Sequence, residues 1–243
     1  MSATAAHWDR VYTQKDVTKV SWYQPTPHSS LRLVRQFAAP GASVVDVGAG
    51  ASLLVDHLLD AGHTDLTLVD ISAVALDITR QRLGPRAQGV DTQATDLLAW
   101  SPGRTFDVWH DRAVFHFLTS ADAIAAYRER LHNSLVPGGL AIVAAFHTTG
   151  PDRCSSLPTA QYTADRLHAA LGGSDAFERL EDTIEAHPHP RGGTQAFQVV
   201  ALRKRPNLRM QGQPHAHPHA IGQGLATERA SGPDTALHHH AEG

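Results

Sequence analysis

The chain has 243 residues, of which 42% are hydrophobic and 19% charged, with a formal net charge of −3. Its size suits one sizeable core or a core with a tail, and its charge offers no basic footprint for phosphates, so we expect no nucleic-acid partner. Cys154 is the single cysteine, which excludes an internal disulfide. No apolar run approaches the roughly 20 residues of a membrane span, and residues 1–10 lack the apolar core of a secretion signal. We therefore expect a cytoplasmic protein without membrane contact.

Residues 7–30 form a lead-in rich in aromatic side chains, ahead of the first strand. Trp8 and Tyr12 are followed by Trp22 and Tyr23. Aromatic faces attract cations by about 0.5–2 kcal/mol and exclude water, so the cluster predicts a lid over a cationic ligand. The alternative is ordinary packing of an N-terminal helix on the sheet. The next element is a helix to residue 37, with Ser29-Ser30 as its expected cap.

A strand over 43–47, a tight turn and a helix to residue 60 follow. Gly48 and Gly50 stand where a ligand lies against the backbone, because a Cβ would fill that space and disfavour a positive φ. The turn is not the dinucleotide fingerprint, since Leu53 stands where G-x-G-x-x-G requires its last glycine. A plain strand-to-helix corner with Asp46 as the helix cap is the alternative.

Three more strands are expected to end in acids. The strand over 66–69 ends in Asp70, the weak strand over 89–94 precedes Asp96, and the strand over 106–110 precedes Asp111. A carboxylate at the position of Asp70 can accept hydrogen bonds from both hydroxyls of a ribose, or else cap the helix over 73–83 together with Ser72. The carboxyl ends of parallel strands share one crevice, so we expect these acids and Asp46 to converge there.

The second half continues with helices over 122–134 and 163–171, and strands over 140–146, 177–186 and 194–203. This alternation predicts an α/β fold, a doubly wound sheet with helices on both faces. The expected organisation is an N-terminal lid and helix over 1–39, a core over 40–205 and a tail over 206–243. The tail is rich in Gly, Pro and His with few large apolar residues, so we expect it to be disordered and to hold no functional metal site.

Taken together, these residues resemble the class I S-adenosylmethionine-dependent methyltransferases. Residues 46–50 look like that family's first motif, residues 95–97 its adenine-contacting motif, and residues 136–140 the Pro-Gly-Gly turn before its fifth strand. The likeness covers about residues 40–146 in order, with Ser52 in place of a third glycine. It implies a Rossmann-like, mostly parallel seven-stranded sheet with a terminal antiparallel hairpin, S-adenosylmethionine as the cofactor, and these cofactor-binding residues: Trp22, Tyr23, Asp46, Gly48, Gly50, Asp70, Ile71, Asp96 and Leu97.

By the same resemblance, residues 111–117 lie on the side of the methyl acceptor. Asp111 is a candidate to orient or deprotonate the acceptor, and His116, with an ordinary pKa near 6.5, is a candidate base. The alternatives are a structural His116 and an ion pair between Arg112 and Asp111. Methyl transfer from a sulfonium loses charge at the transition state, so no base is obligatory. Acceptor specificity is expected from the lid and residues 147–158, with Cys154 as a small filler or a substrate contact.

These observations predict a methyltransferase that acts on a small molecule, with the oligomeric state left open. Methylation of protein lysines is the first alternative, and a noncatalytic nucleoside-binding module is the second. The Trp-Asp-x-x-Tyr pattern at 8–12 and the Ser-Trp-Tyr at 21–23 resemble a bacterial subgroup of small class I methyltransferases. They are more distantly similar to a eukaryotic group that methylates lysines of a translation factor.

Overall fold

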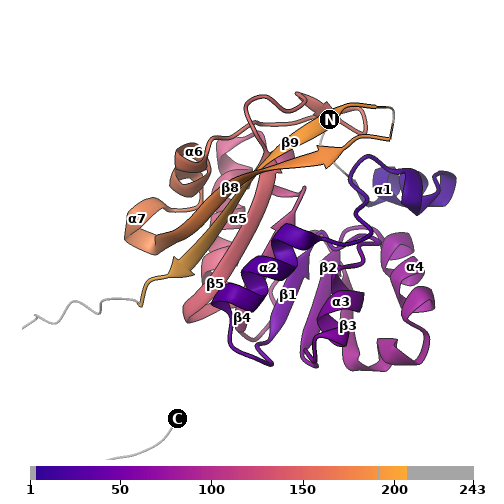
Figure 1. The fold of residues 1–243 in the computed structure, drawn as a ribbon, viewed down its shortest axis with the longest axis horizontal. Helices are drawn as coiled ribbons and strands as arrows, with labels where there is room; N and C mark the ends of the chain where they lie inside the picture. The colour runs from indigo at the N-terminus through magenta and orange to yellow at the C-terminus, as the bar shows by residue number, and fades with distance from the viewer. Residues whose placement is uncertain (1–3, 191, 207–243) are drawn as a thin grey trace, which may run out of the picture. The chain divides into compact units, whose positions relative to one another are not determined.

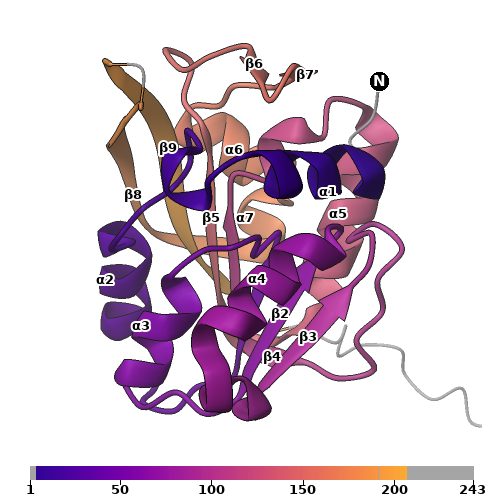
Figure 2. The same ribbon diagram turned by 90° about the vertical axis from the view of Figure 1, so that its right-hand side faces the viewer.

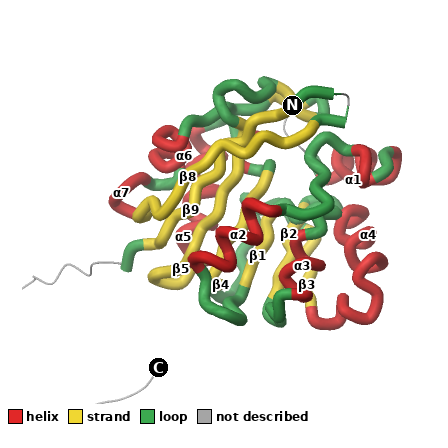
Figure 3. The backbone as a smooth tube through the Cα atoms, viewed as in Figure 1, coloured by secondary structure: helices red, strands yellow, loops and turns green. Residues whose placement is uncertain are grey.

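Hydrophobic runs buried on both faces form the centre of a seven-stranded sheet with the strand order β3-β2-β1-β4-β5-β9-β8 (Figures 1 and 3). The computed structural model describes residues 4–190 and 192–206. Neighbouring strands are parallel from β3 to β5, whereas β9 is antiparallel to both β5 and β8. The predicted fold class is therefore confirmed. The strands are β1 (Val44–Val47), β2 (Leu66–Asp70), β3 (Val90–Ala94), β4 (Phe106–Arg112), β5 (Leu135–Phe146), β8 (Phe177–Pro188) and β9 (Thr194–Lys204).

Helices cover both faces of the sheet, because successive side chains of a strand point to opposite sides. Val44 packs in a core with α2 (His28–Phe37), α3 (Leu54–Asp60) and α4 (Ala73–Leu83). Its neighbour Val45 packs in a second core on the other face, together with Tyr127 of α5 (Ala121–Ser134) and Leu167 of α6 (Ala164–Ala170). A one-turn helix, α7 (Gly173–Ala176), leads into β8.

The lead-in contains a helix, α1 (Ala5–Gln14), and a 3₁₀ turn at Val17–Lys19. The side chain of Thr4 caps α1 by accepting a hydrogen bond from the backbone N–H of His7. The helix packs beside α4, at the end of the sheet where the parallel strands terminate (Figures 1 and 2). A short hairpin of β6 (Arg153–Cys154) and β7 (Leu157–Pro158) follows β5.

Two predicted boundaries were wrong. The helix α2 begins at His28 without a side-chain cap, and Ser30 is buried with its hydroxyl 2.8 Å from Nε2 of His110. The strand β5 begins at Leu135 rather than at residue 140, because the Pro-Gly-Gly segment stays in the sheet through an irregular register with β4, with Gly138 at a φ of 80°. In the part of the chain that the structure describes, no helix is both long and apolar enough to cross a bilayer. Residues 207–243 of the predicted tail lie outside the described residues.

Candidate active site

A cavity of about 540 Å³ lies at the carboxyl ends of β1, β2 and β4. This volume falls within the range of about 300–1,000 Å³ that is typical of small-molecule sites. Residues of α1, of the segment after it and of the β6–β7 hairpin also line the cavity. The structure brings most of the predicted cofactor-binding residues together in its wall, namely Trp22, Tyr23, Asp46, Gly48, Asp70, Ile71, Asp96 and Leu97.

The turn after β1 is packed too closely for any residue other than glycine at two positions. Gly48 has a φ of +63°, and a Cβ there would lie 1.9 Å from Cγ2 of Val114. Gly50 has a φ of +53°, and its Cβ would lie 2.3 Å from the hydroxyl of Tyr12. Gly48 lines the cavity, whereas Gly50 lies beneath Tyr12 and is not part of the lining. Protein side chains, and not only a ligand, therefore require these glycines.

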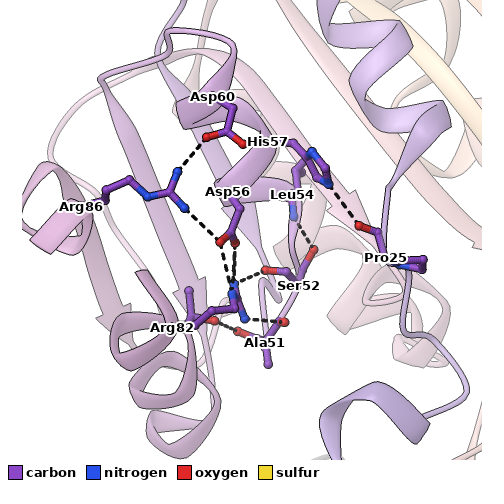
Figure 4. A network of polar contacts seen from close by, with 11 residues as sticks. Pro25, Ala51, Ser52, Leu54, Asp56, His57, Asp60, Arg82 and Arg86 are labelled. Atoms are coloured by element: carbon purple, nitrogen blue, oxygen red, sulfur yellow. Dashed lines mark hydrogen bonds and ion pairs between the residues drawn. The ribbon is translucent and has the colours of Figure 1, made fainter. Parts of the chain in front are cut away.

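An arginine of α4 holds the residues that follow this turn (Figure 4). Arg82 donates hydrogen bonds to the carbonyls of Ala51 and Ser52, at 3.1 and 2.7 Å, and forms an ion pair of 2.8 Å with Asp56 of α3. Ser52 replaces the third glycine of the motif, and its hydroxyl accepts a hydrogen bond from the N–H of Leu54. Ser52 thereby supplies a side-chain acceptor to the first turn of α3, where the N-cap residue makes no such bond.

The same network extends to the lead-in. Arg86 bridges Asp56 and Asp60 of α3, and the ring Nε2 of His57 lies 3.1 Å from the carbonyl of Pro25 (Figure 4). The glycine turn, α3, α4 and the segment before α2 are thus tied together by polar contacts.

Asp70 joins the first turn to the second. Its two carboxylate oxygens accept hydrogen bonds from the N–H groups of Gly50, at 2.8 Å, and Ser72, at 2.7 Å. Burial raises the pKa of Asp70 to about 6, although both hydrogen bonds favour the ionised form. Ser72, not Asp70, is the residue that caps α4, through a bond from the N–H of Ala75.

Asp46 and Asp96 complete the acidic part of the cavity wall. Asp46 lies 2.7 Å from Nδ1 of His110, and this pair rather than helix capping occupies its carboxylate. Asp96 accepts a hydrogen bond of 2.9 Å from the N–H of Leu98 in the turn after β3. Leu97, which stands between Asp96 and Leu98 in the sequence, is buried in the core. Three of the four predicted acids therefore meet at the cavity, whereas we expected all four.

The fourth acid, Asp111, does not line the cavity. Side chains alternate along β4, so His110 and Arg112 face the cavity while Asp111 faces α5. There it accepts hydrogen bonds from the hydroxyl of Tyr127, at 2.6 Å, and the N–H of Val114, at 3.1 Å. Burial raises the pKa of Asp111 to about 6.

His116 is also absent from the cavity wall. It is fully buried, its ring stacks on Phe146 with 4.1 Å between centroids, and its Nδ1 accepts a hydrogen bond from the N–H of that residue. Burial and the nearby charge of Arg112 lower the pKa of His116 to about 3, so the ring is neutral. These contacts match the structural alternative considered for His116.

Aromatic side chains of the lead-in form one wall. The indole of Trp22 donates to the hydroxyl of Tyr12 at 3.3 Å, and Trp8 packs edge-on against Trp22 and Phe117, with centroids 5.7 and 5.4 Å apart. Burial raises the pKa of Tyr12 well above its ordinary value, so its hydroxyl stays protonated. Asp9 fastens α1 to α4 by accepting a hydrogen bond of 2.6 Å from Ser72.

A polar cluster beside this wall was missed by the sequence analysis. Arg112 does not pair with Asp111; it pairs with Glu185 of β8, at 3.1 Å, and Gln24 donates to the same carboxylate at 2.9 Å. Glu185 is 73 residues from Arg112 in the chain, so no local pattern connects them.

Comparison with known proteins adds to this geometry. Residues 45–141 match a protein family described as "Methyltransferase domain". The fold is similar to that of the Burkholderia thailandensis 1,6-didemethyltoxoflavin-N1-methyltransferase, solved with 1,6-didemethyltoxoflavin and S-adenosylhomocysteine, with a TM-score of 0.59, 24% identity and 81% of each chain covered. Residues 45–141 of this chain therefore form a methyltransferase domain. The predicted enzyme class and cofactor are confirmed, and the noncatalytic alternative is set aside.

Two curated relatives are also similar to this methyltransferase. The "eEF1A lysine and N-terminal methyltransferase" of Mus musculus is 27% identical over 110 residues, which are 45% of this chain and 16% of that protein. The "EEF1A lysine methyltransferase 2" of Danio rerio is 26% identical over 162 residues, covering 60% of this chain and 70% of the relative. The methyltransferase thus aligns with less than a fifth of the mouse protein.

The site fits S-adenosylmethionine in four respects. The cavity volume is that of a small-molecule site, the glycine turn brings bare backbone to its wall, and Asp70 presents a buried carboxylate at the end of β2. The aromatic wall suits a sulfonium cation.

Proposed function

We propose that the methyltransferase acts on a small-molecule acceptor bound inside the cavity. The observation that carries this proposal is that α1 and the β6–β7 hairpin line the cavity at the carboxyl ends of the parallel strands. Trp8 and Tyr12 of α1 line one side of the cavity, and Cys154 and Leu157 of the β6–β7 hairpin line another. A cavity of about 540 Å³ walled by these elements suits a compact acceptor better than a protein surface.

In this proposal the cofactor lies along the carboxyl ends of β1, β2 and β3. Gly48 and Gly50 shape the turn for its methionine part, and Asp70 accepts hydrogen bonds from the ribose hydroxyls. Ile71, Asp96 and Leu97 surround the adenine, Asp46 supports the turn through His110, and Trp22 and Tyr23 face the sulfonium.

The bound cofactor supplies a methyl group on a positively charged sulfur. The chain's own residues align the acceptor with that group and exclude water, since dispersal of charge in the transition state is favoured by apolar surroundings. We assign Asp111 a positioning role, because it holds the N–H of Val114, whose side chain packs over Gly48. We assign His116 to the packing of the end of β5.

Protein-lysine methylation is the second candidate. The similarity to the two eEF1A methyltransferases favours it. In that case the target lysine would enter the cavity as a side chain, and the rest of the protein substrate would remain outside.

Transfer of a labelled methyl group separates the two candidates. Purified enzyme and S-adenosylmethionine labelled at its methyl group are incubated with a bacterial lysate, which is then divided into macromolecular and small-molecule fractions. We expect label in the small-molecule fraction and none with the Asp70→Ala variant. Label confined to protein would overturn the small-molecule proposal in favour of lysine methylation.

A further inference from the structure

Arg112 is the one lysine or arginine in the cavity wall formed by the described residues. Asp70 and Asp96, at the ends of β2 and just after β3, lie on one half of the sheet. Arg112 ends β4 and directs its guanidinium toward the other half, because its partners lie on β8 and β9. The cavity therefore has acids at one end and a guanidinium at the other.

The guanidinium is fixed from three sides. It donates to the carbonyl of Trp22 at 3.0 Å and to Glu185 at 3.1 Å, and it lies 4.5 Å above the ring centroid of Phe197. The side chain of Arg112 is 9% exposed. A planar cation held in this way is preorganised for a ligand, since little rotamer entropy is left to lose on binding.

Glu185 does not remove this cation from the cavity. Its Oε1 already accepts from both Arg112 and Gln24, and Glu185 is not part of the cavity wall. The positive member of the pair faces the cavity, and the negative member lies behind it. Of the five N–H donors of a guanidinium, the Nε–H of Arg112 has no partner among the described residues.

We infer that Arg112 binds a carboxylate of the methyl acceptor, which is therefore a small acid with a flat, apolar body. The guanidinium is the side chain best suited to a carboxylate, by parallel N–H···O bonds. Trp22, Phe117 and Leu157 line the cavity with it and supply apolar surface for the body. This inference rests on the proposed small-molecule function and names its acceptor class.

The test uses the full chain saturated with S-adenosylhomocysteine. Its affinity is measured by calorimetry for a panel of flat aromatic acids, such as indole-3-carboxylate and salicylate, and for the amide of each. We expect at least one acid to bind about tenfold more tightly than its amide, because only the acid offers the guanidinium a negative charge and two acceptor oxygens; tenfold corresponds to about 1.4 kcal/mol. Arg112→Gln removes the difference, whereas the same change at exposed Arg35 preserves it.

Arg112→Gln leaves the partly buried Glu185 without its cation, which can destabilise the fold. The double variant Arg112→Gln/Glu185→Gln removes both charges and is expected to fold and to lose the preference for the acid. A wild-type enzyme that binds no acid above its amide would overturn the inference.

A second arm tests whether Arg112 binds the carboxylate of the cofactor instead of that of the acceptor. The inference fails if Arg112→Gln lowers the affinity for S-adenosylhomocysteine tenfold but leaves unchanged the affinity for 5′-methylthioadenosine, which lacks that carboxylate. Failure of the wild-type chain to bind either nucleoside would instead refute the proposed cofactor site, so the two failures are distinguishable.

Discussion

Gly48 shows how a single missing Cβ shapes the site. We expect Gly48→Ala to lower the affinity for S-adenosylhomocysteine at least tenfold. The new Cβ would lie 1.9 Å from Cγ2 of Val114, and a positive φ adds about 1–2 kcal/mol of strain. Gly62→Ala is the matched control, since Gly62 has a φ of +89° but nothing within 4 Å of its Cβ position. Calorimetry on both variants checks this, and equal affinities would contradict it.

Asp70 predicts a pH dependence of cofactor binding. Its pKa of about 6 means that the carboxylate becomes protonated below that pH, and a protonated carboxyl loses acceptor capacity for ribose hydroxyls. We expect the affinity for S-adenosylhomocysteine to fall by up to about tenfold per pH unit below pH 6.

The variant Asp70→Asn is expected to bind weakly at every pH and to show no such slope. Asp111→Asn is the control for the slope alone: Asp111 also has a pKa of about 6 but lies outside the cavity wall, so this variant should keep the pH dependence whatever its affinity. A flat wild-type profile between pH 5 and 7 would contradict the prediction.

The raised pKa of Asp70 also affects the stability of the fold, and here a lower pH is favourable rather than unfavourable. Because the folded pKa of Asp70 is raised from 3.8 to about 6, the folded chain binds this proton more tightly than the unfolded chain does. The unfavourable contribution of the buried charge is absent below about pH 4 and fully present above about pH 6. Acidification in that window therefore weakens cofactor binding while relieving this one cost to the apo fold.

At the scale of elements, α1 is held on α4 by few polar contacts. Asp9 accepts from the hydroxyl of Ser72 at 2.6 Å, and Trp8 packs on Trp22. We expect Asp9→Ala to loosen α1, to raise the dissociation constant of S-adenosylhomocysteine about three- to tenfold, and to speed proteolysis within residues 5–19.

The control for this change is Asp77→Ala, which removes an exposed carboxylate of α4 that pairs with Arg80. Exposed pairs contribute about 0–1 kcal/mol, so this variant should bind like the wild type. Deletion of residues 1–24 is the stronger form of the same test, and unchanged affinity after the deletion would refute the lid.

The elements between residues 43 and 146 were predictable because each carries its own periodicity. The strands β1, β2 and β5 contain continuous apolar runs, and the helices α4 and α5 begin at the polar caps Ser72 and Ser120. The helix α1 was missed because the short segment after its Thr4 cap was interpreted only as a cluster of aromatic residues. The early start of β5 was missed because Pro137 and Gly138 normally mark a turn.

The candidate site was predictable where its residues follow strands directly. Asp46, Asp70 and Asp96 share the carboxyl edge of the sheet, so their meeting needed only the parallel topology. Asp111 was misplaced because alternation along β4 turns it toward Tyr127. The pairing of Arg112 with Glu185 depends on β8 joining the sheet next to β9, and no local sequence pattern encodes that.

For the whole molecule, cofactor binding should appear as thermal stabilisation. The ligand contacts β1, β2, β3 and the lid in our proposal, so its binding free energy is lost when these elements separate. At a concentration of 100 times its dissociation constant, S-adenosylhomocysteine adds about 2.7 kcal/mol to the free energy of unfolding. In a chain of this length that corresponds to an increase in melting temperature of about 5–10 °C.

Differential scanning fluorimetry across a ligand titration checks the size and the concentration dependence of this shift. Asp70→Ala should abolish most of it at the same ligand concentration, because the buried carboxylate is the proposed ribose contact. Gly62→Ala should keep the full shift from its own baseline, since Gly62 is not part of the cavity wall. An equal shift in Asp70→Ala and the wild type would mean that the nucleoside binds elsewhere on the chain.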